Sequence, residues 1–401
     1  MYALYQKSLN NTRKKKKMRN TFIAMFSFLT FMAALIGCDR VQEGVAPIQV
    51  ETVKIGFLAS GSRVTYPNGA KIAVSEANAS GGLLGMPVEL IVVAEISTAD
   101  AAIEAASKMI HTDNVIALVG PNRSAHAIPV GVFAQEHRIP MVTTTATNPA
   151  VTSAGDFVFM AAFTDSFQGA VMAQFAIDDL NITTAAVLTR IGDPYTEGIA
   201  EFFARNFSEL GGTIAANEFY EGLATDWTAQ LTNIAAAKPD ALFIASFSPE
   251  VSLITQQARA IPLQNAIGVP TIFFGADAWD NVILLTDEKA EIEGSFFSGH
   301  FSSDSDAPTA RTFVDTYVSI YDTPPNGGIA VSYDAVKLLF HAVERAGSLD
   351  PEAIRQQLAA TENYIGATTI AGYNENRHPT KSAVIFTIKD GKKQFHKQID
   401  P

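Results

Sequence analysis

The sequence has one cysteine, Cys38, among its 401 residues. A single thiol cannot form an internal disulfide, so folding does not rely on cross-links even in an oxidising compartment. The motifs GxxxxGK[ST], GxSxG and HExxH are absent, and no GxGxxG follows a predicted strand. The seven histidines show no zinc-binding spacing with cysteine. These absences favour a binding protein over an enzyme, and we expect no cofactor and no metal.

Basic residues are also few, and they are unevenly placed. The chain has 29 lysines and arginines against 41 aspartates and glutamates, a formal net charge of −12. Seven of the 29 precede residue 38 in a stretch without acids, which leaves 22 against 41 in the remainder. This balance argues against a general affinity for nucleic acid. A hydrophobic content of 47% with 17% charged residues indicates a globular chain of two or three ordinary domains.

The basic block is followed by an apolar run at residues 22–36, which is 15 residues long. A helix needs about 20 residues to cross hydrocarbon, so the run is typical of a signal-peptide core. The letters LIGC at residues 35–38 resemble the bacterial lipobox, which implies a lipoprotein signal peptide at residues 1–37 and lipidation of Cys38. In that interpretation Asp39 favours retention at the inner membrane, and Met18 is an alternative start. A short anchor helix with an incidental cysteine is the other interpretation.

The rest of the chain alternates strand-like apolar runs with helical patterns. The first series has strands at 53–58, 88–94, 115–119 and around Met141, with helices near 68–78, 99–110 and 124–136. The second has strands at 185–189, 213–220, 241–245 and 271–274, with helices near 166–180, 196–210, 227–237 and 249–260. Helices near 309–321, 328–346 and 351–359 precede a hairpin of 383–388 and 393–398. The alternation predicts an α/β fold in which a parallel sheet covered on both faces occurs twice.

Two loops that leave predicted strands are rich in hydroxyl groups. In open α/β sheets, ligands bind beyond the carboxyl ends of the strands. The loop at 120–125 reads GPNRSA and places Ser124 to cap the next helix, whose N-terminal N–H groups and dipole favour a carboxylate. The loop at 143–149, TTTATNP, offers several donors and acceptors. The residue types leave a plainer interpretation open, in which Ser124 only caps the helix and the threonines only satisfy a turn.

Several segments occur in an order and spacing that together are specific for one family. They include EANASGGLLGMPVELIV, VGPNRSAHAIPV, IPMVTTTATNPAVT, GDPYTEGIAEFF and DWTAQLTNIAAAKPDALFIASFSPE. In these segments the chain resembles the type I periplasmic binding proteins of the branched-chain amino-acid-binding group. The resemblance implies two doubly wound parallel-sheet lobes joined by a hinge, which trap a ligand when they close. It implies an N-terminal lobe at 50–162 plus 299–366 and a C-terminal lobe at 163–298 plus 367–401, and the lack of periodicity before them indicates a tether at 38–49.

The same resemblance implies roles for individual residues. The positions matched to the ligand carboxylate and the neighbouring α-ammonium are Ser124, Thr145, Ala146 and Thr147. Asp277 matches an acidic position that pairs with the ammonium, although by composition alone it would be a solvated turn or cap aspartate. The positions matched in the second lobe are Tyr195, which covers the ligand, and Phe247 and Ser248, which line the side-chain pocket.

Arg123 departs from the family pattern, because the family often has a serine or a small residue there. Two interpretations are open. Arg123 binds a second ligand carboxylate bidentately, which would favour an acidic ligand, or it points to solvent. Phe247 and Trp279 would instead suit an apolar or aromatic ligand side chain. Two further candidates border the expected pocket mouth: Arg63 and Tyr66.

The sequence therefore predicts a lipid-anchored extracytoplasmic receptor without covalent chemistry. It would capture a small amino acid or related carboxylate and deliver it to the permease of an ABC importer. The expected partners are this ligand, the permease, and the membrane reached through Cys38, with no nucleic acid. A ligand sensor for a membrane signalling partner is the second hypothesis, and a hydrolase on a twin α/β scaffold is the third.

Overall fold

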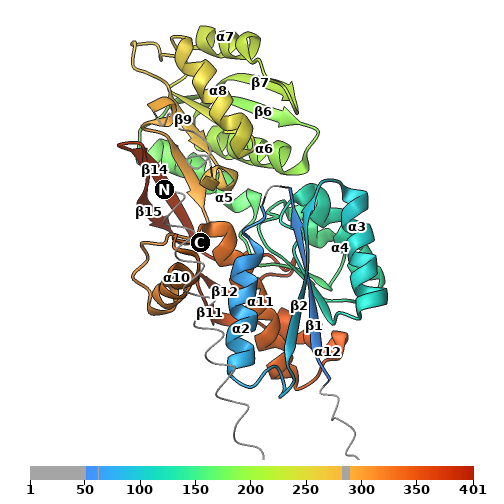
Figure 1. Cartoon of the computed structure of the whole chain (residues 1–401). Helices are drawn as coiled ribbons and strands as arrows, with labels where there is room; N and C mark the ends of the chain where they lie inside the picture. The colour runs from blue at the N-terminus through green and yellow to red at the C-terminus, as the bar shows by residue number, and fades with distance from the viewer. Residues whose placement is uncertain (1–50, 62, 282–289) are drawn as a thin grey trace, which may run out of the picture. The chain divides into compact units, whose positions relative to one another are not determined.

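The computed structural model describes residues 51–61, 63–281 and 290–401 (Figure 1). The expected signal peptide at 1–37, the tether at 38–49 and Cys38 lie outside the described residues. The chain from residue 50 onward forms one compact unit. This unit holds two large sheets, and we call each sheet with the helices that cover it a lobe.

The first lobe is built on a five-stranded parallel sheet in the order β2-β1-β3-β4-β5. Its strands are β1 (Val53–Ser60), β2 (Val88–Ile96), β3 (Ala117–Val119), β4 (Met141–Thr143) and β5 (Val158–Met160). Phe57 of β1 packs under α2 (Pro67–Ala79) and α11 (Gly327–Ala346), whereas the next residue, Leu58, packs under α3 (Ala99–Lys108) and α4 (Ser124–Glu136). Both faces are therefore buried, which is why these strands are apolar nearly throughout.

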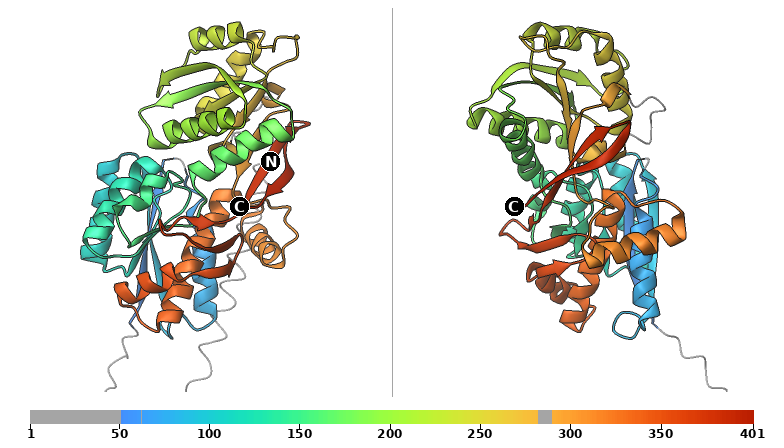
Figure 2. Two further views of the ribbon diagram at one scale, coloured as in Figure 1. Left: turned by 180° about the vertical axis from the view of Figure 1, so that it is seen from behind. Right: turned by 90° about the vertical axis from the view of Figure 1, so that its left-hand side faces the viewer.

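The second lobe is built on a seven-stranded sheet in the order β15-β14-β10-β9-β8-β6-β7. Figure 2 shows the ribbon from behind and from the side. Its strands are β6 (Thr184–Ile191), β7 (Thr213–Glu221), β8 (Ala241–Ala245), β9 (Ile272–Gly275), β10 (Phe296–Gly299), β14 (Ala383–Lys389) and β15 (Lys392–Ile399). The first five run parallel, and β14 and β15 pair antiparallel. Phe243 of β8 packs with α5 (Asp165–Asp178) and α6 (Pro194–Glu209), and Ile244 packs with α7 (Thr228–Ala237) and α8 (Ser248–Ala260).

Smaller elements complete the unit. They are η1 (Met109–Asp113), η2 (Pro149–Ala154), η3 (Asp277–Asn281), η4 (Ala290–Ile292), α10 (Pro308–Tyr321), α12 (Pro351–Ala359), β11 (Glu362–Ile365), β12 (Thr369–Tyr373) and β13 (Pro379–Thr380). The antiparallel sheet β11-β12-β13 contributes Tyr364 and Ile370 to the core of the first lobe. The chain leaves the first sheet after β5, returns after β10, and leaves again between β13 and β14. The exact residue boundaries of the lobes stay a prediction.

The predicted fold class is confirmed, because two parallel-stranded sheets carry helices on both faces. The terminal hairpin is also confirmed as β14 and β15. The pattern did not predict β5, β10 or the three-stranded sheet. Several of these strands are only two to four residues long, and such short runs give little periodic signal.

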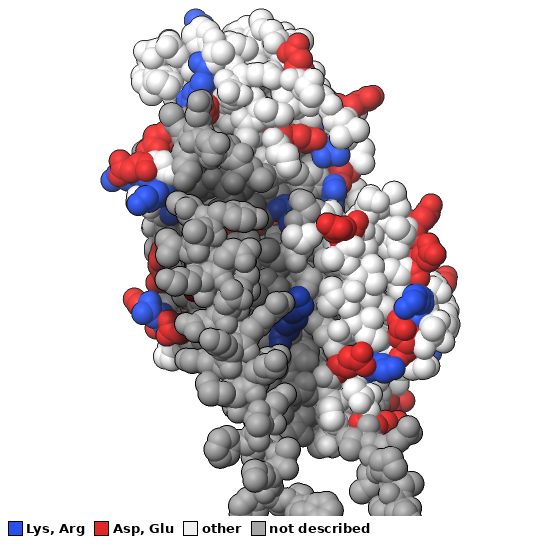
Figure 3. All heavy atoms as spheres, viewed as in Figure 1, with Lys and Arg blue, Asp and Glu red and all other residues white. Residues whose placement is uncertain are grey.

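One face of the molecule shows how its charged side chains are distributed. On the face shown in Figure 3, acidic and basic side chains are interspersed over the coloured surface, without a continuous basic patch among the described residues. A search of the helices in the described ranges finds none that is long and apolar enough to span a bilayer.

Gly120 holds the loop after β3 directly against β1. Its φ angle is +85°, and an added Cβ would lie 2.2 Å from the carbonyl oxygen of Leu58. A side chain at this position would meet both a left-handed backbone conformation and a backbone clash. The loop that leads to Ser124 therefore depends on glycine here.

We expect Gly120→Ala to lower the free energy of unfolding by about 2 to 4 kcal/mol, because left-handed strain adds to overpacking. Gly85→Ala is the matched control, since Gly85 has a φ of +79° and no heavy atom within 4 Å of an added Cβ. The control should lose only about 1 to 2 kcal/mol. Urea unfolding at 25 °C measures both, and equal losses would show that the loop moves off β1 without cost.

Lys381 is a buried lysine between β13 and β14, with 3% of its surface exposed. Its Nζ donates to the carbonyl oxygen of Ala161 and to Thr368 Oγ1, both at 2.9 Å. Ala161 follows β5, so the lysine joins two of the segments that connect the sheets. Burial lowers the pKa of Lys381 from 10.5 to about 8, although the charge of Asp334 opposes this shift.

Lys381→Met should remove a pH-dependent part of the stability. Because the unfolded chain holds the lysine proton more tightly, the wild-type free energy of unfolding should rise between pH 8 and 10.5 relative to the variant, by on the order of 3 kcal/mol. Urea unfolding across this pH range measures the difference. The exposed Lys71 serves as control, since Lys71→Met should keep the rise. A difference between wild type and Lys381→Met that does not vary with pH would contradict the lowered pKa.

Candidate functional site

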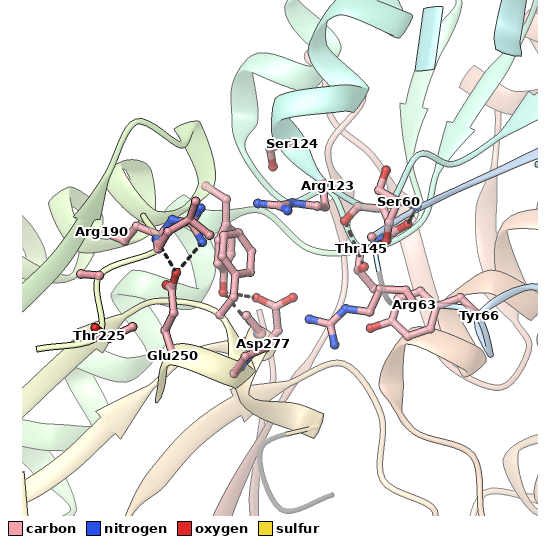
Figure 4. Close-up of a pocket in the computed structure, with 18 residues that line it drawn as sticks. Ser60, Arg63, Tyr66, Arg123, Ser124, Thr145, Arg190, Thr225, Glu250 and Asp277 are labelled. Atoms are coloured by element: carbon pink, nitrogen blue, oxygen red, sulfur yellow. Dashed lines mark hydrogen bonds and ion pairs between the residues drawn. The ribbon is translucent and has the colours of Figure 1, made fainter. Parts of the chain in front are cut away.

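A cavity of about 460 Å³ lies where loops from the carboxyl ends of both sheets meet (Figure 4). The first lobe lines it with Ser60, Gly61, Arg63, Tyr66, Asn122, Arg123, Ser124 and Thr145. The second lobe lines it with Arg190, Tyr195, Leu223, Ala224, Thr225, Phe247, Pro249, Glu250, Asp277 and Ala278. The volume is in the range of small-molecule sites, and the position is the one expected for open α/β sheets.

Seven of the ten predicted ligand-binding residues line this cavity: Tyr66, Arg123, Ser124, Thr145, Tyr195, Phe247 and Asp277. The other three, Ala146, Thr147 and Ser248, are buried behind its wall. Ser248 is used structurally, because its hydroxyl donates to the carbonyl oxygen of Ala278 at 2.8 Å. Contacts between these residues and a ligand stay a prediction.

Ser124 begins helix α4, and its hydroxyl faces the cavity. The expectation that Ser124 caps this helix is wrong, because the capping position is Arg123, which makes no side-chain cap hydrogen bond. Ser124 Oγ instead accepts a hydrogen bond from the backbone N–H of Asn148 at 3.2 Å. Its own hydroxyl hydrogen is not used in that bond and can be donated to a ligand. The first turn of α4 adds backbone N–H groups and a partial positive charge, so this wall suits a carboxylate.

The loop around Asn122 is held in place by reciprocal hydrogen bonds with β1. The Ser60 backbone N–H donates to Asn122 Oδ1 at 2.6 Å, and Asn122 Nδ2 donates to the Ser60 carbonyl at 3.4 Å. Thr145 Oγ1 donates to the Asn122 carbonyl at 3.3 Å. His126 Nδ1 lies 2.8 Å from Ser60 Oγ. Burial and the charge of Arg123 lower the pKa of His126, so this imidazole is neutral at neutral pH.

Asp277 begins η3 on the opposite wall and is almost fully buried, with 8% of its side chain exposed. Its Oδ1 accepts hydrogen bonds from Tyr195 Oη at 2.9 Å and from Gln168 Nε2 at 3.1 Å. Its Oδ2 lies 3.2 Å from His300 Nε2. Burial by itself raises the pKa of Asp277, but His300 and the two hydrogen bonds outweigh it and hold the pKa below its usual value. Asp277 is therefore an ionised carboxylate, and not the solvated turn residue that its composition alone suggested.

A second carboxylate, that of Asp165, lies behind Asp277 and shares its glutamine. Gln168 Nε2 donates to Asp165 Oδ1 at 2.8 Å as well as to Asp277. Burial and the nearby charge of Asp277 raise the pKa of Asp165 well above its usual value. Two close carboxylates avoid carrying two charges when one keeps its proton, so the negative charge at this wall belongs to Asp277.

Arg123 forms an ion pair across the lobes, and its binding of a ligand carboxylate stays a prediction. Its Nη2 forms an ion pair with Asp193 Oδ2 of the second lobe at 2.8 Å, and 29% of its side chain is exposed. Its Cζ lies 4.3 Å from the ring centroid of Phe247. Nearby, Asn148 Nδ2 donates to the carbonyl oxygen of Pro194 at 2.6 Å. The Arg123–Asp193 ion pair and the Asn148–Pro194 hydrogen bond each join one lobe directly to the other.

Tyr66 lies at the cavity, whereas Trp279 lies in a hydrophobic core. The Tyr66 ring lies at the cavity against Gly328 of α11, where an added Cβ would be 1.9 Å from Tyr66 Cζ. Trp279 lies in the core of the second lobe, and its Nε1 donates to the Ile244 carbonyl at 3.2 Å. Trp279 does not line the cavity, so the suggestion that it receives a ligand side chain is wrong.

Sequence reasoning missed a polar network on the second lobe. Arg190 Nη1 pairs with Glu250 Oε1 at 3.0 Å. Glu250 Oε2 accepts hydrogen bonds from Ser246 Oγ at 2.8 Å and from Tyr220 Oη at 3.0 Å. The rule that was applied to the strands before Ser124 and Thr145 would have found Arg190, which lies at the carboxyl end of β6. In the described ranges, no group of three or more histidine, cysteine, aspartate or glutamate side chains is arranged to hold a metal ion.

Comparison with known proteins gives consistent matches over most of the chain. The sequence model of the family described as "Periplasmic binding protein" matches residues 52–393. The Leu/Ile/Val-binding protein BraC3 of Rhizobium johnstonii is 27% identical over 321 residues, which cover 78% of this chain and 85% of the relative.

Two solved structures are also similar. The leucine-binding protein LivK of Thermotoga maritima is 33% identical with a TM-score of 0.79, over 87% of this chain and 99% of the other. The branched-chain amino-acid transporter substrate-binding protein LivJ of Streptococcus pneumoniae, in complex with isoleucine, is 27% identical with a TM-score of 0.79, over 88% and 100%.

Proposed function

Because the chain belongs to the type I periplasmic binding proteins of the branched-chain amino-acid family, we propose that it captures a small α-amino acid and delivers it to an ABC importer. The observation that carries the proposal is the pairing of two opposite walls across one cavity. The ionised Asp277 lies on one wall, and Ser124 with the first turn of α4 lies on the other. A zwitterionic amino acid has an ammonium that can bind Asp277 and a carboxylate that can bind Ser124 and the first turn of α4.

Binding of this kind uses charge-assisted hydrogen bonds in a cavity that largely excludes water. Such bonds are about twice as strong as those between neutral groups. Asp277 is already held by Tyr195, Gln168 and His300, so it does not need to reorganise when the ammonium arrives. A preorganised carboxylate loses little conformational entropy on binding, which favours affinity.

Replacing Asp277 by asparagine tests the ammonium assignment, because the change removes the charge and keeps the shape. We expect the affinity for the preferred amino acid to fall at least about thirtyfold in isothermal titration, the scale for truncating one partner of a buried charge pair. In the wild type, that amino acid at one hundred times its Kd should raise the free energy of unfolding by about 2.7 kcal/mol.

Asp179→Asn is the control, because Asp179 pairs with Lys397 outside the cavity and should bind like the wild type. Undiminished binding by Asp277→Asn would refute the ammonium role. Failure of every amino acid to stabilise the wild type would refute the proposed function as a whole.

We also propose that the mature protein is held at the periplasmic side of the inner membrane by lipid on Cys38. The basic leader, the 15-residue apolar run and the letters LIGC support this step. Acyl chains contribute about 0.8 kcal/mol per buried methylene, so two or more chains hold a protein firmly at a bilayer.

Cys38→Ala should abolish acylation and move the protein out of the membrane fraction. Fractionation of cells, followed by mass spectrometry of the N-terminal peptide, measures both effects. Wild-type protein should leave the membranes only with detergent. A Cys38→Ala protein that is still processed after residue 37 and still sediments with the membranes would contradict the anchor.

A further inference from the structure

Three arginines and two carboxylates line the cavity. Five charged side chains line it: Arg63, Arg123, Arg190, Glu250 and Asp277. Arg123 is neutralised by Asp193 at 2.8 Å, and Arg190 by Glu250 at 3.0 Å. Among the residues that the structure describes, Arg63 has no ion-pair partner. Its guanidinium carbon instead lies 5.7 Å from the ring centroid of Tyr66.

The Arg63 side chain extends from the first lobe into the cavity, toward Asp277 (Figure 4). An α-amino acid would place its ammonium at Asp277 and its carboxylate at Ser124, as proposed above. Neither of these groups neutralises Arg63. The ammonium would instead bring a second positive charge toward it.

Burial of an unpaired charge is unfavourable, and the unpaired guanidinium of Arg63 would lose water when the lobes enclose a ligand. A ligand with a second carboxylate reduces this penalty, because that carboxylate can pair with Arg63 while the ammonium pairs with Asp277. The planar guanidinium is well suited to hold such a carboxylate through two parallel hydrogen bonds.

The aromatic wall of the cavity also carries positive charge. Phe247 lies close to two guanidinium groups, with Arg123 Cζ at 4.3 Å and Arg190 Cζ at 5.3 Å from its ring centroid. The positive charge beside this ring favours a ligand that carries an anionic group.

From these observations we infer that the ligand is an α-amino acid with an anionic side chain, whose second carboxylate binds Arg63. This inference rests on the proposed function and narrows its ligand class. It differs from the apolar ligands in the names of the relatives.

Isothermal titration of the purified protein with matched amino acids tests the inference. L-glutamate and L-aspartate are compared with L-glutamine and L-asparagine, which have nearly the same shape without the second charge, and with L-leucine. We expect the wild type to bind one acid at least tenfold more tightly than its amide. In Arg63→Gln the ratio of acid to amide affinity should fall close to one.

Two further variants make the test specific. Arg63→Lys keeps the positive charge but cannot make two parallel hydrogen bonds to one carboxylate, so it should retain part of the preference for the acid. Arg205→Gln removes an arginine that pairs with Glu201 outside the cavity, and it should retain the full preference. Circular dichroism and thermal unfolding establish that each variant is folded.

The outcomes separate this inference from the proposed function. Tighter binding of leucine or an amide than of either acid would overturn the inference and leave the proposed function standing. An acid preference that persists unchanged in folded Arg63→Gln would overturn the role of Arg63. Absence of binding by every amino acid would overturn the proposed function, and the inference with it.

Discussion

Burial of both faces of two parallel sheets is the constraint on which the rest of the structure depends. Adjacent residues of one strand, such as Leu242 and Phe243, pack into different cores, so the strands have little room for polar side chains. Polar chemistry therefore gathers where the strands end. In both lobes these ends carry the loops that line the cavity, and the loop before Ser124 is held against β1 by the close contact of Gly120 with Leu58.

The division of charge at the second wall follows from the same burial. Asp165 and Asp277 lie close together around one glutamine, and water cannot screen them. Asp277 has His300 and Tyr195 as additional partners, so it carries the charge, while Asp165 is driven toward its neutral form. The pKa values of these two aspartates are thus shifted in opposite directions by their surroundings. Composition alone could not have assigned the charge to either of them.

Local patterns predicted the parts of the fold that depend on neighbouring residues. The long helices and several apolar strands, for example β8, follow from periodicity, and the loops at Ser124 and Thr145 follow from strand ends. The partners of Arg123 and Arg190 could not be predicted in this way, because they lie 70 and 60 positions away and meet only through the arrangement of the strands. Asp277 likewise meets Gln168 at a separation of 109 positions.

The contacts that join the lobes without any ligand have a consequence for how the protein is tuned. The ion pair of Arg123 with Asp193 and the hydrogen bond of Asn148 with Pro194 stabilise this arrangement of the lobes whichever solute the cavity holds. The free energy of these contacts changes the binding constant of every solute by the same factor. Sensitivity and selectivity are thus encoded by different residues. Evolution could adjust the first to a scarce or abundant nutrient at these contacts, without altering which nutrient is chosen.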